Sequence, residues 1–189
     1  VGVDFSDKAI ATAQELASRC QVVTHYICCD IYDLPHHLEG QFDIVFTSYG
    51  TIGWLPDLNP WAQMIAQRLK KGGVFYIVDF HPIVWMFDYS SGKPQMRYGY
   101  DQEEVIYEEY QGTYADTDNK MTSKEYGWNH GLAQTITALL DAGLQLDFFR
   151  EHHESPYDIL PELVKKENGH YETSDRLYPL LFELQFSKG

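Results

Sequence analysis

The residues best suited to chemistry stand at the start of the chain, in Val1-Gly2-Val3-Asp4-Phe5-Ser6. A short apolar strand ends there in an aspartate, and a serine then opens a helix. A carboxylate at the carboxyl end of a parallel strand can accept two hydrogen bonds from the hydroxyls of a ribose. The segment therefore predicts a site for a nucleotide-like cofactor. The alternative is that Asp4 only caps the helix beside Ser6.

The elements after this segment alternate between helix and strand. Ser6 is an N-cap for a helix over 6–19, whose apolar side chains recur at helical spacing. These apolar residues are Ile10, Ala13, Leu16 and Ala17. Residues 22–29 and 42–47 read as strands, and the second has contiguous apolar residues, which is typical of a parallel sheet covered on both faces. Asn59-Pro60 opens a helix to 69, and Gly72-Gly73 ends it before a strand over 74–79.

The end of the chain follows a different pattern. A helix is predicted over 131–142, with Gly143 closing it. Two later segments alternate apolar and polar residues, which indicates strands with one wetter face. Their apolar residues are Leu144, Leu146 and Phe148 in the first segment and Phe182, Leu184 and Phe186 in the second. We expect a mostly parallel sheet that finishes in an antiparallel pair.

Composition limits the classes of function. The 189 residues fit one domain, and 44% apolar residues suffice for a packed core. A formal charge of −14 disfavours a nucleic-acid partner. Three cysteines (Cys20, Cys28 and Cys29) are too few for a disulfide framework, and residues 1–189 show neither the pattern of a signal peptide nor a long apolar run. We expect a cytoplasmic protein without a membrane partner, and the sequence indicates no oligomeric state.

An ordered series of segments resembles the class I S-adenosylmethionine-dependent methyltransferases. Residues 1–82 carry the resemblance most strongly, and the helix and strand around Ala142-Gly143-Leu144 carry it more loosely. The segments are Val1-Gly-Val-Asp-Phe-Ser, Cys29-Asp30-Ile31, Phe42-Asp43-Ile44-Val45, Trp54-Leu55-Pro56-Asp57 and Leu69-Lys-Lys-Gly-Gly-Val-Phe. The resemblance implies an α/β, Rossmann-like three-layer sandwich with an antiparallel last strand.

The resemblance also indicates that one family element is absent from these residues. In the family, a strand and its glycine-rich loop come immediately before the segment that matches Val1 to Asp4, and this sequence does not contain them. We therefore expect residues 1–189 to be a single, N-terminally incomplete methyltransferase domain. If the protein did begin at Val1, we would expect weak cofactor binding or none.

The family's cofactor residues map onto a few positions of this chain. The resemblance assigns Asp4 to the ribose hydroxyls and Phe5 to the adenine face. It assigns Asp30 to the adenine amino group and the N–H of Ile31 to a ring nitrogen, although Asp30 could instead be a turn former. Ser48 and Tyr49 match the segment near the methionine amine. The implied cofactor is S-adenosylmethionine, and its product is S-adenosylhomocysteine.

The implied reaction is displacement at a sulfonium methyl group, with a small molecule as the acceptor. Such a reaction needs alignment, exclusion of water and, for some acceptors, removal of a proton. His81 directly follows a predicted strand and His130 directly precedes a predicted helix, so both are candidate catalytic bases. For each histidine, a helix cap or a loop hydrogen bond is the alternative.

Residues 83–129 are too long for an ordinary connection and are predicted to form a substrate lid. The segment is rich in aromatic residues, and residues 104–110 have the composition of a strand in a small hairpin. Trp85 and Trp128 in this segment, with Trp54, are candidate substrate-binding residues; packing of a small subdomain is the alternative. The acidic run over 101–118 most simply faces solvent, although an amine substrate is conceivable.

Other arrangements are weaker. His36-His37 and His152-His153 are adjacent pairs whose side chains diverge, so no metal site is expected. A nicotinamide-dependent Rossmann oxidoreductase is the rival enzyme, because it also places an acidic residue after its second strand. Asp30 and the antiparallel finish disfavour it. A non-catalytic cofactor-binding or scaffold protein with the same fold stays a third possibility.

Overall fold

The computed structural model describes residues 1–89, 91, 93–111 and 122–189. Within these ranges the helices are α1 (Asp7–Arg19), α2 (Leu58–Arg68) and α3 (Leu132–Asp141). The longer strands are β3 (Phe42–Ser48), β4 (Leu69–Phe80), β7 (Gln102–Gln111), β8 (Thr122–Asn129), β9 (Leu144–His152) and β13 (Leu181–Lys188). The shorter strands are β1 (Gly2–Asp4), β2 (Tyr26–Cys28), β5 (Phe87–Asp88), β6 (Gln95–Met96), β10 (Glu154–Ser155), β11 (Val164–Lys165) and β12 (Tyr171–Glu172).

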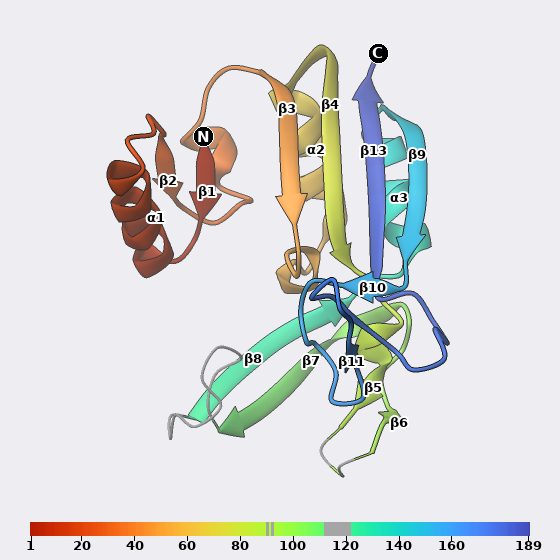
Figure 1. Cartoon of the computed structure of the whole chain (residues 1–189). Helices are drawn as coiled ribbons and strands as arrows, with labels where there is room; N and C mark the ends of the chain where they lie inside the picture. Colours follow the sequence, from red (N-terminus) through yellow and green to blue (C-terminus); the bar gives the residue numbers. More distant parts are fainter. Residues whose placement is uncertain (90, 92, 112–121) are drawn as a thin grey trace.

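The central sheet has the strand order β3-β4-β13-β9 (Figure 1). β3 and β4 are parallel, and β13 runs antiparallel to both β4 and β9. The predicted antiparallel pair at the end of the chain is confirmed. The last strand, β13, lies between β4 and β9. This arrangement brings the carboxyl ends of β3, β4 and β9 to one edge of the sheet.

Helices α2 and α3 cover one face of this sheet (Figure 1). Trp61 and Ile65 of α2 and Leu139 of α3 are almost completely buried. The sheet residues in the same core alternate along their strands, and these are Phe75, Ile77, Phe182, Leu184 and Phe186. Because side chains of a strand alternate between its faces, the residues between them point to the opposite face.

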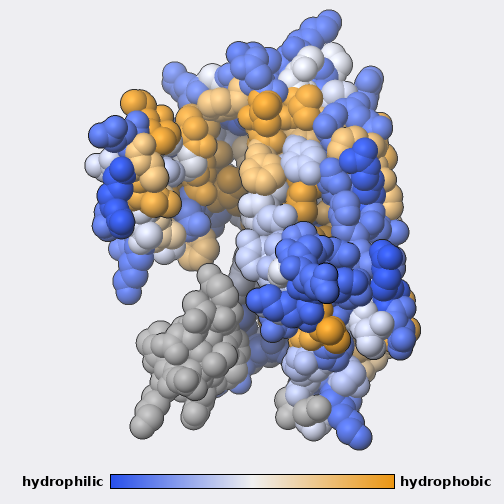
Figure 2. All heavy atoms as spheres, in the orientation of Figure 1, coloured by the Kyte–Doolittle hydropathy of each residue, from blue (hydrophilic) through white to orange (hydrophobic). Residues whose placement is uncertain are grey.

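The opposite face of the sheet carries no helix of the described chain, contrary to the expectation that both faces are covered. Ile44 and Phe46 of β3 are 68% and 58% exposed there. Figure 2 shows apolar surface in the upper part of this face and a hollow between it and the part of the chain that contains α1. The contiguous apolar residues of β3 thus point to both faces of the sheet: Val45 packs against the core, whereas Ile44 and Phe46 are exposed on the opposite face.

The first elements form a separate β-α-β unit. β1 pairs in parallel with β2, and Ser6 caps α1 by accepting a hydrogen bond from the N–H of Ala9. Ile10 and Ala17 are buried as predicted, but Leu16 is 58% exposed because the unit is too small to cover it. The predicted strand over 22–29 is shorter than expected, and Val23 lies in an exposed loop before β2.

β1 and β3 face each other in Figure 1, and neither has a strand on that side among the described residues. β1 pairs only with β2, and β3 pairs only with β4. Their backbone N–H and C=O groups along these two edges therefore have no ladder partner in this part of the chain.

The chain also departs from the predicted start of α2 and β4. Asp57, rather than Asn59, is the N-cap of α2, and its Oδ1 accepts a hydrogen bond from the N–H of Asn59. β4 begins at Leu69, before the Gly72-Gly73 pair, because Leu69 already pairs with Phe42 and the register shifts before Val74.

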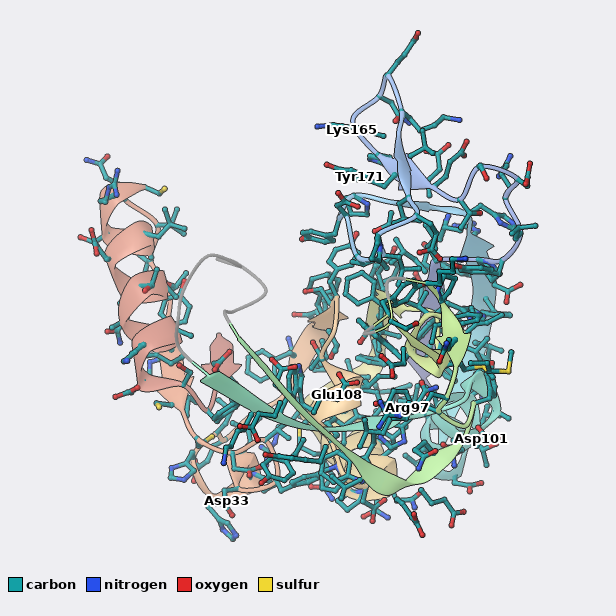
Figure 3. All side chains as sticks on the ribbon, turned by 90° about the horizontal axis from the view of Figure 1, so that it is seen from below. Asp33, Arg97, Asp101, Glu108, Lys165 and Tyr171 are labelled. Carbon is teal, nitrogen blue, oxygen red and sulfur yellow. The ribbon has the colours of Figure 1, made fainter. Side chains whose placement is uncertain are left out.

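A hairpin and a small sheet flank the carboxyl edge of the central sheet. The predicted hairpin is present, because β7 pairs with β8 and contains residues 104–110. Residues 112–121 of the predicted lid lie outside the described residues. A small sheet of order β10-β12-β11, which the sequence did not predict, joins β9 to β13. Figure 3 shows Lys165 and Tyr171 of this sheet on one side of the edge, with Asp101 and Glu108 on the other.

None of the helices described above is both long and apolar enough to cross a lipid bilayer.

The sheet core supplies a test of the fold. We expect Leu184→Ala to lower the free energy of unfolding by about 3 kcal/mol, because Leu184 is fully buried between β4 and β9 and its truncation leaves a cavity. Urea unfolding measures this change. Leu177→Ala is the control, since Leu177 is 71% exposed, and it should change the stability by less than about 0.5 kcal/mol. Equal effects of the two substitutions would contradict the placement of β13.

Candidate active site

Asp4 and Asp30 lie at the tips of two adjacent parallel strands. Asp4 pairs with Cys28 in the β1–β2 register, and Asp30 follows two residues later. Each aspartate accepts one hydrogen bond from the backbone two residues further on, from Ser6 N–H at 2.7 Å and from Tyr32 N–H at 2.9 Å. Both side chains are otherwise exposed, so the remaining oxygens of two neighbouring carboxylates are accessible at one edge.

Phe5 and Ile31 follow these aspartates and differ in their surroundings. The Phe5 side chain is 78% exposed beside Asp4, where its ring is free to cover a flat ligand. Ile31 packs against the main core, and its N–H has no hydrogen bond to the described residues. The structure therefore brings Asp4, Phe5, Asp30 and Ile31 to the same edge.

A tight turn follows β3 at the same edge of the molecule. Ser48 ends the strand, and Tyr49 and Gly50 have left-handed φ angles of 37° and 77°. Gly50 needs this freedom because residues with a Cβ atom rarely adopt such a conformation. The turn aims successive backbone N–H groups of residues 50–52 at one side chain of β4.

That side chain is Asp79, which is 2% exposed at the end of β4. Its carboxylate accepts hydrogen bonds from the N–H groups of Gly50 at 2.5 Å, Thr51 at 3.0 Å and Ile52 at 3.2 Å. A fourth hydrogen bond comes from the N–H of Phe80 at 2.7 Å. Burial raises the pKa of the Asp79 carboxyl, and these four donors act in the opposite direction. Asp79 thus holds the turn that carries Ser48 and Tyr49.

His81 lies two residues beyond Asp79 and is 5% exposed. The N–H of Ile83 donates to its Nδ1 at 3.2 Å, so the proton of the neutral ring is on Nε2, which is 3.0 Å from Glu151 Oε1. Burial lowers the pKa of His81, although Glu151 partly opposes this shift. Both ring nitrogens are occupied, and the ring joins β4 to β9. Its role as a base stays a prediction.

His130 lies at the end of β8, and its Nε2 is 2.6 Å from the carbonyl oxygen of Leu55. The ring lines a cavity of about 310 Å³ together with Trp128. The start of α2 and one side of α3 complete the lining, through Pro56, Asp57, Leu58, Asn59, Gln134, Thr137 and Ala138, with Gln102 and Glu103 of β7. His130 and Trp128 are therefore brought together, whereas His81 belongs to a different group.

The three candidate tryptophans occupy separate places. Trp54 is 50% exposed in a short 3₁₀ helix that packs against β8. Trp85 is 40% exposed, and its ring lies 5.5 Å from the ring of Phe80. Phe80 also contacts Tyr157 at 6.1 Å, and Tyr157 contacts Tyr49 at 5.2 Å. The carboxyl edge of β3 and β4 thus carries an aromatic cluster, which contains Trp85 but neither Trp54 nor Trp128.

Two residues of this region were not predicted from the sequence. Asp79 could have been found, because it is an acidic residue that ends a predicted buried strand. Asn129 had no comparable signal: it is 1% exposed, and its Nδ2 donates to the carbonyl oxygens of Pro82 and Gly99, which ties the β7–β8 hairpin to the end of β4. Among the residues described, no three His, Cys, Asp or Glu side chains are grouped to hold a metal ion.

Comparisons with known proteins agree with this arrangement. Residues 1–77 match a family model described as a methyltransferase domain. A solved S-adenosylmethionine-dependent methyltransferase from Clostridium acetobutylicum is 14% identical, with a TM-score of 0.61 over 99% of this chain and 74% of that chain. The chain has a class I methyltransferase fold. The resemblance inferred from the sequence is therefore confirmed.

Two further structures share this methyltransferase fold. An S-adenosylmethionine-dependent methyltransferase from Mesorhizobium loti is 16% identical, with a TM-score of 0.58 over 99% of this chain and 79% of its own. The glycopeptide N-methyltransferase MtfA, solved with S-adenosylmethionine, is 11% identical, with a TM-score of 0.59 over 99% of this chain and 71% of its own. No curated protein matches the chain.

Asp79 can be tested without a substrate. We expect Asp79→Asn to lower the free energy of unfolding by about 2–3 kcal/mol, because an amide group replaces a charged acceptor and leaves buried N–H groups unpaired. Urea unfolding gives the total change, and hydrogen exchange should show faster exchange at Gly50, Thr51 and Ile52. Asp43→Asn, at an exposed aspartate paired with Lys70, is the control. Unchanged exchange at residues 50–52 would refute the anchoring role.

His81 predicts a pH dependence of stability. The folded state holds this ring neutral, with a pKa below the ordinary value of 6.5, whereas the unfolded chain takes up a proton near 6.5. The free energy of unfolding therefore falls as the pH drops below about 6.5, until the folded ring is also protonated. Urea unfolding between pH 7.5 and 5 should show a weaker dependence for His81→Gln than for the wild type. His37→Gln, at an exposed histidine, should keep the wild-type dependence.

Proposed function

We propose that the protein transfers a methyl group from S-adenosylmethionine to a small-molecule acceptor by in-line displacement. The observation that carries the proposal is the position of Asp4 and Asp30 at adjacent strand tips. Both residues belong to the segment that matches the methyltransferase family model, which supports an enzyme of the methyltransferase class.

The residues at this edge fit the chemistry of an adenosine. Two accessible carboxylates can accept hydrogen bonds from ribose hydroxyls and from an amino group. The N–H of Ile31 has no partner in the described chain and can donate to a ring nitrogen. The exposed ring of Phe5 can cover an aromatic face. When bound, S-adenosylmethionine supplies a methyl carbon that is already activated by the positive sulfur.

The chain's own contribution is positioning. Asp79 holds the turn after β3 that carries Ser48 and Tyr49, which supports a role for this turn in positioning the methionine part of the cofactor. A rigid turn of this kind lowers the entropic cost of aligning two reactants. The acidic surface disfavours a nucleic-acid acceptor. The cavity beside His130, at about 310 Å³, is of a size that binds small molecules. The three free cysteines are consistent with a cytoplasmic location, which is part of the proposal.

We also propose that a further parallel strand lies between β1 and β3 in the active protein. The two facing edges have no ladder partners in the described chain, and Ile44 and Phe46 are exposed beside them. A strand there would join the β1–β2 unit to the central sheet. Its carboxyl end would come between the adenosine edge and the turn after β3, where the family places its glycine-rich loop.

The rival function is a nicotinamide-dependent oxidoreductase. It would use a single acidic residue on the ribose and has no need for a second carboxylate at the next strand tip. The paired placement of Asp4 and Asp30 and the antiparallel β13 favour the methyltransferase.

Binding of S-adenosylhomocysteine tests the proposal. We expect Asp4→Asn to weaken binding by about 10- to 100-fold, because it removes charge-assisted hydrogen bonds, and Asp30→Asn to weaken it by about 10-fold. Asparagine retains the oxygen that accepts from Ser6 or Tyr32, so the local fold is kept. Isothermal titration calorimetry on the complete gene product that contains these residues measures the change.

Asp33→Asn is the matched control, since Asp33 is exposed in the same loop and caps nothing with its side chain. The affinity of the Asp33→Asn variant for S-adenosylhomocysteine should stay within about twofold of the wild-type value. Heat of binding with NADH but not with S-adenosylhomocysteine would instead support the oxidoreductase. Wild-type affinity in the Asp4→Asn variant would exclude the ribose role.

A further inference from the structure

A second cavity of about 510 Å³ lies on the face of the central sheet opposite α2 and α3. We call this the helix-free face, because no helix of the described chain covers it. The cavity lining includes Tyr49 from the turn that Asp79 anchors, and Tyr76, His152 and Glu183 from the sheet. In the sequence, His152 is one of two adjacent histidines whose spacing does not suit a metal site. In the structure, His152 belongs to a group of polar side chains that converge on one carboxylate.

That carboxylate is Glu183 of β13, which is 9% exposed. Its Oε1 accepts hydrogen bonds from Tyr76 at 2.8 Å and from Arg150 at 3.4 Å. Burial alone would raise the pKa of Glu183, but the donors Tyr76, His152 and Arg150 bring it below its ordinary value. Burial and this carboxylate raise the pKa of Tyr76 to about 12, so the phenol stays a donor. Glu183 is therefore an ionised and fixed acceptor.

His152 Nε2 lies 2.8 Å from the other oxygen of this carboxylate. Because a carboxylate only accepts, the neutral ring carries its proton on Nε2. Nδ1 is then the nitrogen with a free lone pair, and no hydrogen bond joins it to the residues described here. A histidine oriented in this way by a carboxylate is the arrangement of a general base.

Strand register places His152 at the edge used by the proposed reaction. Ser48 pairs with Val78, Val78 with Glu183, and Glu183 with Arg150, so these residues form one row across the sheet. His152 lies two residues beyond Arg150, at the level of the turn that contains Tyr49 and Gly50. Three strand spacings, about 14 Å, separate β3 from β9. An acceptor above β4 and β13 would lie between the turn and His152.

We propose that this cavity holds the methyl acceptor and that His152, oriented by Glu183, removes its proton. The proposal rests on the proposed function and names an acceptor class, a small molecule with an N–H or O–H group. The electron pair of that atom forms the bond to the methyl carbon, and the carbon–sulfur bond breaks. The acceptor's proton passes to Nδ1 of His152, and the sulfur leaves as a neutral thioether.

His152 fits this role better than the two histidines singled out from the sequence. Both nitrogens of His81 are occupied, by Ile83 and Glu151. His130 donates to the carbonyl oxygen of Leu55 and has no carboxylate that would stabilise a protonated ring. Among these three residues, only His152 combines a carboxylate partner, a free nitrogen and a place in a cavity with Tyr49.

The test compares His152→Gln, Glu183→Gln and His37→Gln with the wild-type complete gene product. Methyl transfer is followed from S-adenosylmethionine with a labelled methyl group to a mixture of small primary amines and phenols. We expect His152→Gln to lower transfer by about 100-fold or more and Glu183→Gln to lower it less. Calorimetry with S-adenosylhomocysteine should give wild-type affinity for both. The exposed His37 serves as the control and should retain wild-type transfer.

A second measurement does not depend on turnover. Long-range 1H–15N spectra of the histidine rings should show His152 with its proton on Nε2 in the wild type and in a mixture of tautomers in Glu183→Gln. Transfer within threefold of wild type in His152→Gln would overturn the proposal. Loss of S-adenosylhomocysteine binding in that variant would also overturn it, because His152 would then be structural. A wild-type protein that binds no S-adenosylhomocysteine would instead reject the proposed function itself.

Discussion

The pairing of β13 with both β4 and β9 is the constraint on which the rest of the structure depends. Phe182, Leu184 and Phe186 point from this strand to α2 and α3 and are fully buried. The alternating residue Glu183 points to the other face, where it binds Tyr76, Arg150 and His152. Because strand side chains alternate between the faces, β13 supplies core residues on one face of the sheet. On the other face it supplies the carboxylate that binds these three polar side chains.

The same pairing brings the candidate site together at one edge. With β13 between them, β4 and β9 run parallel and end at the same edge of the sheet, and hydrogen bonds to the buried carboxylate of Asp79 hold the turn after β3 at that edge. Asp79 and Glu183 are both buried carboxylates that bind several donors. Such groups are stable only when their hydrogen bonds are nearly complete, so each one fixes the geometry of its donors.

The two halves of the proposed reaction belong to different parts of the structure. The β1–β2 unit carries Asp4 and Asp30 for the methyl donor, whereas the helix-free face carries His152 for the acceptor. Tyr49 belongs to both regions, since it follows β3 and lines the second cavity. The open edges of β1 and β3 lie between them, so a strand there would complete the connection.

The local pattern of the sequence was sufficient to predict α1, α3, β3 and the antiparallel finish, because periodicity, caps and glycine positions act within a few residues. It also placed Asp4 and Asp30 at strand ends. The β10-β12-β11 sheet and the exposed face of β3 were not predicted, since burial depends on which distant segments pack together. Asn129 and the His152–Glu183 pair depend on contacts between residues 30 to 47 positions apart. Only the tertiary structure decides such contacts, because the chain must fold before these groups meet.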